Sequence, residues 1–488
     1  MTAQPTAAPV PATTASRSAT VVALTVIAGT VMIPLDVTVV AVALTRLSEE
    51  TGASLPVIQW VSTGYTLALA TVIPSAAWAM GRFGARAVFL SAIVVFTLGS
   101  LLVACAWDAG SLIGFRVVQG LGGGFVMPAA MTLALRAAPQ GERGRVMALL
   151  GLPILVGPVL GPPLGGWLLD NLSWRWIFLV NLPVGLVAVW LARRNLPRLP
   201  ADGRAALDRG GVLLLAPAMA LLVLGTSLAE ESLLRPSVLL PVAGGLLLMA
   251  AFTRHALRIR DPLLKVHLLA RRPTGGGALL LVLFAGGYFA TIVLVPMYFQ
   301  VARGETATTA GLLMVPQAVL AGISIQVSGR LIDRVQPLRV IGTGIVMAVA
   351  GYSGFVAQLD SEASYWRLVP CLVLATTGAG ATMLPTITMA TRYLDDPDIP
   401  SGSTTINVLN QLATSVTTAA AAVLLASALG ARAPALAGDG IGALQALPAA
   451  ERLALAPAVS EAVQVAFLLP VGMMAAALVV AVITFRRH

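Results

Sequence analysis

The feature that most constrains this chain is a series of long apolar runs with almost no charge. A helix needs roughly 20 mostly apolar residues to cross a bilayer. Fourteen segments have a suitable length and composition to be transmembrane helices. They cover residues 19–44, 57–79, 87–106, 112–135, 146–169, 176–192, 211–229, 238–253, 276–301, 310–327, 340–358, 368–390, 404–429 and 462–485. Hydrophobic residues make up 57% of the 488 positions and charged residues 11%, against about 25% charged in soluble domains. The sequence therefore predicts an all-α membrane protein with 14 transmembrane helices.

The basic residues predict the orientation of these helices. With the N-terminus in the cytoplasm, the cytoplasmic tails and loops hold 23 Lys and Arg and the outer loops hold 7. Such an asymmetry is the positive-inside pattern of multi-pass proteins, so we expect a cytoplasmic (inner) membrane location with both termini inside. The net charge of +10 is then a topology signal with some attraction to membrane lipids. No basic stretch forms a domain of its own, so no nucleic-acid partner is expected.

A weak internal match divides the chain into two parallel halves. The run GGGFVMPA at 122–129 aligns with AGATMLPT at 379–386, and the loop GRFGAR at 81–86 aligns with GRLIDR at 329–334. The two loops fall on the same side of the membrane. We expect a disordered tail over 1–18, a six-helix half over 19–195, a two-helix insert with basic flanks over 196–272, and a second six-helix half over 273–488 that includes an outer loop at 430–461. Parallel halves are typical of rocking transporters whose site lies between the halves.

Two formal charges fall inside the apolar runs, Asp36 and Arg116. Ionisable residues in a bilayer are costly, which makes both functional candidates. Asp36 can load and release a proton or attract a cationic substrate, or it can be the permanently ionised partner of a structural arginine. Arg116 is too basic to carry a proton; it can tune Asp36 together with Gln119 on the same helix face, or simply join helices. Pro34 frees a backbone carbonyl, so we expect a bend beside the acid.

Four motifs resemble those of a known family. They read LDVTVVAVAL at 35–44, RVVQGLG at 116–122, GPVLGPPLGG at 157–166 and WRWIFLVNLPVG at 174–185. Together they resemble the fourteen-helix drug:proton antiporters of the major facilitator superfamily, which are multidrug efflux transporters. The resemblance implies proton coupling through Asp36 and Arg116. One departure is Gly81, where the family's loop motif carries an Asp that helps to hold the halves together; Asp333 and Arg334 in the matching loop can take that role.

The third motif has a physical use of its own. Gly157, Gly161 and Gly165 recur every four residues and leave one smooth helix face, while Pro158 and Pro162 bend the helix. With Gly166, these residues are interpreted as a hinge and seal between the halves. Ordinary tight packing is the alternative.

A substrate cavity is expected to collect aromatic, soft and amide side chains from several runs. A lining of this kind suits a large, mostly apolar ligand, although each residue could instead face lipid or the membrane interface. The candidates are Trp60, Tyr65, Gln119, Tyr298, Met383, Asn407 and Asn410.

These observations lead to one functional hypothesis, proton-coupled efflux of lipophilic drugs or antibiotics by alternating access. The expected partners are a small lipophilic substrate, protons and membrane lipids. No Walker loop, enzyme constellation or zinc spacing is found, so we expect a non-enzyme that uses the proton gradient, with no ATP, cofactor or metal. Three alternatives stay open: a dedicated exporter of one endogenous metabolite or lipid, a non-transporting receptor or scaffold on a transporter fold, and, less favoured, uptake by symport.

Overall fold

The structure is a computed structural model, and every regular element in the part that it describes is a helix. The described residues are 12–139, 142–198, 207–228, 236–259, 261–305, 307–332, 334–360, 362–392, 394–395, 398–432 and 455–485. Most of the expected tail and most of the expected outer loop at 430–461 lie outside these ranges. The first helix begins at Ala12, inside the segment expected to be a tail.

The first group of helices corresponds to the first six apolar runs. Its elements are α1 (Ala12–Thr30), α2 (Met32–Thr51), α3 (Leu55–Val72), η1 (Ile73–Ser75), α4 (Ala76–Phe83), α5 (Ala85–Ala104), α6 (Ala109–Ala137), α7 (Arg143–Leu150), α8 (Leu152–Asn171), α9 (Arg175–Leu179) and α10 (Asn181–Asn195).

Four of these runs are interrupted within the membrane-length segment. The first run breaks at Val31, between α1 and α2, so the expected bend near Pro34 is present three residues earlier in the chain. The second run passes through η1, which contains Pro74. The fifth breaks at Gly151 between α7 and α8, and the sixth breaks at Val180 between α9 and α10. The interruptions at Val31 and in η1 fall beside prolines, because proline cannot donate the helical hydrogen bond.

The remaining helices form the insert and a second group. Two helices lie at the place of the expected insert, α11 (Arg209–Ser227) and α12 (Pro236–Ala256). The second group is η4 (Val266–Ala270), α13 (Arg272–Met297), η5 (Tyr298–Ala302), α14 (Ala307–Leu331), α15 (Pro337–Ala357), α16 (Tyr365–Arg392), α17 (Ile399–Arg432) and α20 (Ala456–Phe485).

Thirteen helical segments in the described part are long and apolar enough to cross a membrane. They do not include α8, a 20-residue helix at the place of the fifth apolar run. The all-helical membrane architecture is thus present, and the count of fourteen stays a prediction.

Close helix packing in both groups depends on glycine. A Cβ on Gly120 of α6 would lie 2.5 Å from the Tyr65 carbonyl oxygen of α3, and a Cβ on Gly378 of α16 would lie 2.3 Å from the Gly344 carbonyl oxygen of α15. Backbones this close leave no room for a side chain. The central helices α6 and α16, which carry the matching runs of the internal repeat, therefore pack into their groups by the same means.

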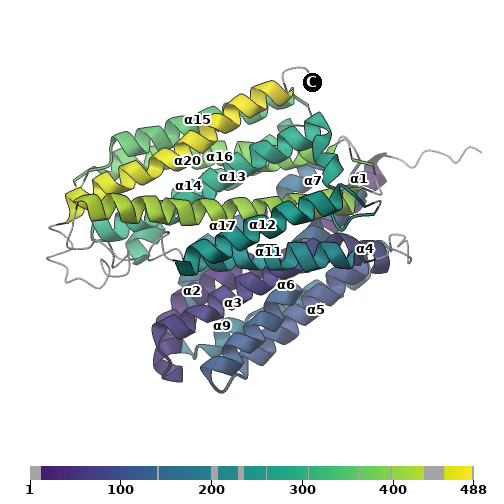
Figure 1. The fold of residues 1–488 in the computed structure, drawn as a ribbon, viewed down its shortest axis with the longest axis horizontal. Coiled ribbons are helices and arrows are strands. Elements are labelled where there is room, and N and C mark those ends of the chain that lie inside the picture. The colour runs from purple at the N-terminus through teal and green to yellow at the C-terminus, as the bar shows by residue number, and fades with distance from the viewer. Residues whose placement is uncertain are drawn as a thin grey trace, which may run out of the picture.

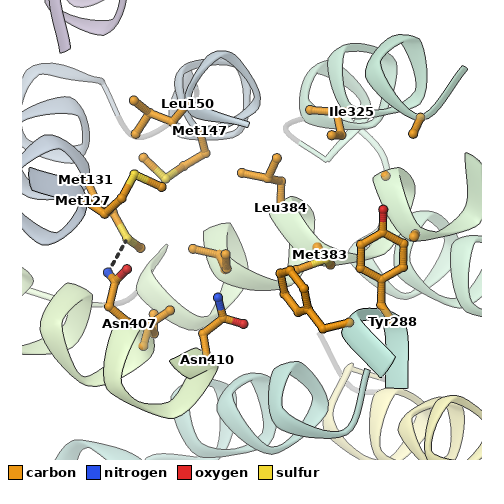
Figure 2. Close-up of a pocket in the computed structure, with 16 residues that line it drawn as sticks. Met127, Met131, Met147, Leu150, Tyr288, Ile325, Met383, Leu384, Asn407 and Asn410 are labelled. Atoms are coloured by element: carbon orange, nitrogen blue, oxygen red, sulfur yellow. Dashed lines mark hydrogen bonds between the residues drawn. The ribbon is translucent and has the colours of Figure 1, made fainter. Parts of the chain in front are cut away.

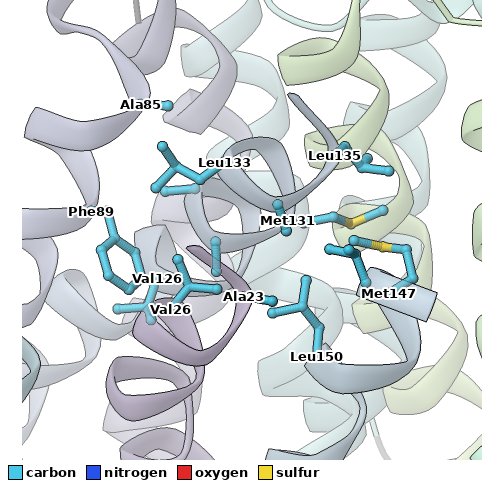
Figure 3. Close-up of a cluster of buried hydrophobic side chains, with 14 of the residues drawn as sticks. Ala23, Val26, Ala85, Phe89, Val126, Met131, Leu133, Leu135, Met147 and Leu150 are labelled. Atoms are coloured by element: carbon cyan, nitrogen blue, oxygen red, sulfur yellow. The ribbon is translucent and has the colours of Figure 1, made fainter. Parts of the chain in front are cut away.

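The two groups meet at one end of the molecule. There α7 packs against α14 and α16, and α4 and α6 pack against α17. One buried cluster runs from α1 and α5 through α6 and α7, as Figure 3 shows for Val26, Phe89, Met131 and Leu150, and it also takes in Leu384 of α16. At the opposite end α2 and α17 finish well apart (Figure 1). Helix α11 lies between the groups and contacts both α3 and α17.

Candidate functional site

The two charges in the apolar runs are paired inside the first helix group. Arg116 of α6 donates from Nη1 to Oδ2 of Asp36 on α2 at 2.5 Å, and the two side chains are 1% and 0% exposed. Arg116 also donates from Nε to the Val61 carbonyl oxygen of α3 at 3.1 Å. Buried charges are stable only when they are paired and hydrogen-bonded, and both conditions are met here.

Amide and hydroxyl groups complete this network. Gln119 accepts from Arg116 at 2.8 Å and donates from Nε2 to Asp36 Oδ1 at 3.0 Å. Asn181, the first residue of α10, donates to the same Asp36 oxygen at 2.9 Å. The Ser100 hydroxyl of α5 accepts from both amides, at 2.7 and 3.1 Å. The Asp36 carboxylate therefore accepts from three side chains, two on α6 and one on α10.

Aromatic rings cover the guanidinium group. Its Cζ lies 4.1 Å from the centre of the Tyr65 ring and 5.7 Å from the centre of the Phe178 ring. Cation–π contacts of this kind stabilise a charge that water does not reach. We therefore find Tyr65, a candidate for the cavity, at the ion pair instead.

The glycine face of α8 lies against α2, the helix that carries Asp36. A Cβ on Gly161 would lie 2.0 Å from Thr38 Oγ1, and a Cβ on Gly157 would lie 2.6 Å from the Pro34 carbonyl oxygen. The Thr38 hydroxyl lies 2.9 Å from the Gly157 carbonyl oxygen. Gly165 approaches Val39, whereas a Cβ on Gly166 would meet no described atom within 4 Å. The side chains of Pro158 and Pro162 are outside the described set.

A cavity of about 940 Å³, counting its open part, lies between the two helix groups (Figure 2). Its walls are mostly apolar and come from α6 and α7 on one side and from α13, α14, α16 and α17 on the other. The lining residues are Met127, Met131, Met147, Leu150, Tyr288, Phe289, Ala321, Ile325, Ala379, Gly380, Met383, Leu384, Ile387, Ile406, Asn407 and Asn410.

The cavity is closed toward the end where the groups meet. Thr132, next to the lining residue Met131, and Ser403, one turn before Asn407, lie with their hydroxyl oxygens 2.8 Å apart across the two groups. Gln326 of α14 donates to the Ala148 carbonyl oxygen of α7 at 3.0 Å. These polar contacts tie the two groups together beside the cavity.

Three of the seven cavity candidates line this space, namely Met383, Asn407 and Asn410. Tyr65 and Gln119 lie at the ion pair. Trp60 of α3 is 40% exposed, and Tyr298 is buried among aromatic rings, where it donates to the Asp360 carbonyl oxygen at 2.6 Å. The methionines of α6 and α7 were not among the candidates, because a methionine in an apolar helix looks like any core residue.

Ser100 and Asn181 were also not among the candidates. Asn181 belongs to the motif WRWIFLVNLPVG, where it is a lone amide in an apolar run. That isolated amide was the sequence feature that could have indicated its role. In the loop of the second half, Asp333 lies outside the described residues and Arg334 is exposed. No group of three or more His, Cys, Asp or Glu side chains that could hold a metal ion occurs in the described residues.

The family follows from comparison with known proteins. Residues 26–418 and 278–488 match the model of the Major Facilitator Superfamily. The chain belongs to this superfamily. The "Multidrug resistance protein B homolog" of Mycobacterium tuberculosis is 39% identical over 399 residues, which cover 81% of this chain and 74% of the relative. A "Putative multidrug resistance protein MdtD" of Yersinia enterocolitica is 31% identical and covers 81% of this chain and 84% of the relative.

Solved structures share the fold at low identity. A bacterial homologue of the iron transporter ferroportin, in an outward-facing state, has a TM-score of 0.63 at 14% identity and covers 97% of this chain and 100% of that one. The human organic anion transporter MFSD10 has a TM-score of 0.57 at 17% identity and covers 96% and 100%. These likenesses concern the fold alone.

Proposed function

We propose that this superfamily member is a proton-coupled antiporter that exports lipophilic drugs or antibiotics by alternating access. The observation that carries the proposal is the combination of an apolar cavity shared by the two helix groups with a fully buried Asp36–Arg116 pair inside one of them. The cavity suits a small lipophilic substrate, and the carboxylate offers a place for a proton. The name of the 39% identical relative, a multidrug resistance protein, agrees with this function.

The proposed membrane arrangement has fourteen spans, with α8 as the fifth. The halves are 19–195 and 273–488, and α11 and α12 form the insert within 196–272. Arginines stand in the last turns of α4, α6, α10, α14 and α16, whose ends lie where the two groups meet. By the positive-inside rule, that end is cytoplasmic. The cavity is then closed toward the cytoplasm, which corresponds to an outward-facing state.

In the proposed mechanism, proton and substrate act on each other indirectly. Asp36 does not line the cavity, and along α6 its partner Arg116 lies roughly 16 Å from the nearest lining residue, Met127. The two ligands therefore do not share atoms. A proton or a substrate can shift the equilibrium between conformational states only if its affinity differs between those states. The coupling therefore has to pass through helices that connect the proton site with the substrate cavity.

Helices α2 and α8 offer such a connection. Asp36 lies on α2, α8 packs on α2 through Gly157 and Gly161, and a Cβ on Gly151, at the start of α8, would lie 2.2 Å from Leu384 in the wall of the cavity. A proton on Asp36 would remove the charge that Arg116 pairs with and weaken the side-chain link between α2 and α6. The glycine face of α8 would act as the hinge and seal, and Asp333 with Arg334 would replace the missing loop Asp at position 81.

The proposal is tested by transport into liposomes that contain purified protein. Uptake of the fluorescent compound N-phenylnaphthylamine is followed with and without an imposed pH gradient, for the wild type, Asp36→Asn and Glu49→Gln. Glu49 is an exposed carboxylate on the same helix and serves as the matched control. We expect gradient-driven uptake by the wild type and Glu49→Gln, and a loss of about tenfold or more in Asp36→Asn, because removing the titratable group removes the coupling.

Gradient-driven uptake in Asp36→Asn equal to the wild type would contradict the role of Asp36. If the wild type moves none of several unrelated lipophilic compounds, the broad substrate range is wrong and a dedicated exporter of one metabolite or lipid takes its place. Absence of gradient-driven flux for those compounds and for candidate metabolites and lipids would favour a receptor or scaffold.

A further inference from the structure

The lining of the cavity carries no formal charge. None of the 16 described residues that form it is Asp, Glu, Lys, Arg or His. Four are methionines, at 127, 131, 147 and 383, and Figure 2 shows them on both sides of the space together with Tyr288. Thioethers are polarisable, adapt their shape and make favourable contacts with aromatic rings. Such a wall matches planar aromatic compounds of varied outline.

One residue of the lining, Asn410, has a side-chain acceptor without a hydrogen-bond partner. Asn410 Oδ1 is buried and accepts no hydrogen bond within the described residues. The other amide in the lining is differently placed, because Asn407 Nδ2 already donates to the Ser403 carbonyl oxygen at 2.8 Å. Its Oδ1 atom has almost no accessible surface, so the Asn410 amide must turn toward the cavity before a ligand can reach the acceptor. Because an unsatisfied buried acceptor is costly, a ligand that brings an N–H or O–H to the turned amide gains more than one that does not.

A permanent cation would find no counter-charge here. Asp36 is the carboxylate that falls within an apolar run. It is already paired with Arg116 and does not line the cavity. Moving an unpaired charge out of water costs more free energy than a cation–π contact with Tyr288 or Phe289 can return.

We infer that this cavity selects uncharged, polarisable aromatic compounds that donate a hydrogen bond to Asn410, and that it discriminates against permanent cations. The inference rests on the proposed function and adds the chemical class of the substrate.

The test is direct binding to the full-length protein in lipid nanodiscs with no pH gradient. Three probes are compared by equilibrium dialysis: N-phenylnaphthylamine, which has an N–H donor; its N-methyl derivative, which has none; and the tetraphenylphosphonium cation. Empty nanodiscs give the partition into lipid. We expect the first probe to bind about tenfold more tightly than the second, the effect of one hydrogen bond to a buried acceptor, and the cation to bind most weakly.

Two substitutions at Asn410 distinguish the effect of the hydrogen-bond acceptor on affinity from the effect of a charge in the cavity. Asn410→Leu should lower the affinity for N-phenylnaphthylamine about tenfold and leave that for the N-methyl derivative unchanged. Asn410→Asp places a carboxylate in the cavity and should raise the affinity for tetraphenylphosphonium at least tenfold. Asn171→Leu, at the exposed end of α8, is the control and should match the wild type.

Equal affinity of the wild type for the cation and for the uncharged donor would overturn the inference. So would an Asn410→Leu variant that retains the tenfold preference for the N–H donor. A failure of the inference can be distinguished from a failure of the proposed function, since binding needs no gradient. If the wild type binds as expected but shows no gradient-driven flux, the inference stands and the proposed antiport fails. If gradient-driven flux is present but binding shows no selectivity, the proposed antiport stands and the inference fails.

Discussion

Asp36 and Arg116 depend on each other because neither charge reaches water in this structure. Each also relies on neutral partners, Gln119 and Asn181 for the carboxylate and the Val61 carbonyl for the guanidinium. Removing one member leaves the other charged, buried and short of its main partner. Removing both leaves no uncompensated charge, so the two losses should not add.

A double-mutant cycle tests this dependence. Asp36→Leu and Arg116→Leu should each lower the free energy of unfolding by about 3–5 kcal/mol. The double variant should lose less than either single variant, because two apolar side chains of similar size can pack where the pair was. Thermal unfolding of the purified proteins in detergent measures the three losses. If the double variant loses the sum of the single losses, the pair is not coupled as the geometry requires.

The sequence predicts the centre of this site better than its surroundings. A charge in an apolar run stands out, which identifies Asp36 and Arg116, and helical spacing adds Gln119 to the same face. Ser100 and Asn181 reach the carboxylate from α5 and α10, and no spacing within one helix indicates which uncharged polar groups meet in space. Tyr65 was predicted to line the cavity and lies over Arg116 instead, because an aromatic ring in a helix suits a cavity and a cation–π contact equally well.

At the scale of elements, α8 illustrates how four-residue glycine spacing sets a helix contact. Gly161 and Gly166 lie on the same helix and differ in what they face, since an added Cβ meets Thr38 at Gly161 and no described atom within 4 Å at Gly166. The sequence grouped both residues in one motif. The structure gives them different surroundings, and this difference can be measured.

Gly161→Ala should push α8 away from α2 and destabilise the protein by about 1–3 kcal/mol, the usual effect of overpacking. It should also slow the transport proposed above. Gly166→Ala should be neutral or up to about 1 kcal/mol stabilising, since alanine is the better helix former. Unfolding temperatures and liposome uptake of the two variants provide the comparison. Equal effects of the two substitutions would mean that the contact with α2 is not what the glycines serve.

Asp208, which lies just before α11, connects α11 with α12 and the segment that follows α12. Its carboxylate accepts from the Gly211 amide at 2.7 Å, from the Leu263 amide at 3.1 Å and from His255 Nε2 of α12 at 2.8 Å. Burial acts to raise the pKa of Asp208, but the hydrogen bonds from His255, Gly211 and Leu263 outweigh it and hold that pKa below its usual 3.8. The ionised form is therefore the one that joins α11, α12 and the following loop.

A pKa that is lowered by folding gives stability that is present above the usual value and lost as the pH falls through the lowered one. From about pH 5 to about pH 3, the unfolding temperature of the wild type should fall more than that of Asp208→Asn, whose amide does not titrate. At neutral pH the variant should be the less stable of the two. The same acid dependence in both proteins would show that other carboxylates account for it.

At the scale of the whole molecule, the apolar runs and the internal repeat predict an all-helical membrane protein with two related helix groups, because both follow from local composition and spacing. The location of the cavity needs the structure. Four of its residues are methionines and two are asparagines on helices far apart in sequence, and they face one space because the groups meet at one end. No pattern in the sequence indicates which end of the molecule is closed, although the residues at the closed end set the preference for this state.

That preference can be altered at Gly329, where α14 crosses α7. A Cβ at Gly329 would lie 2.3 Å from Ala148 Cβ and 2.8 Å from the Gly144 carbonyl oxygen, both in the other helix group. Gly311, at the opposite end of α14, has no described atom within 4 Å of an added Cβ and is the matched control. Gly329→Val should wedge the contact apart, whereas Gly311→Val should not.

Spin labels on the exposed residues Phe83 and Gln336, one in each group at the closed end, report this separation when Cys105 and Cys371 are replaced by serine. In the wild type, pulsed electron–electron double resonance should give a mostly short distance. In Gly329→Val the population should move to longer distances, because a state with a steric clash loses population to the state in which these surfaces are apart. A distribution identical to that of Gly311→Val would mean that the contact of α14 with α7 does not hold the end closed. A shift toward longer distances, together with slower transport, would mean that the close contact at Gly329 helps to set the equilibrium between the closed and open states of this end.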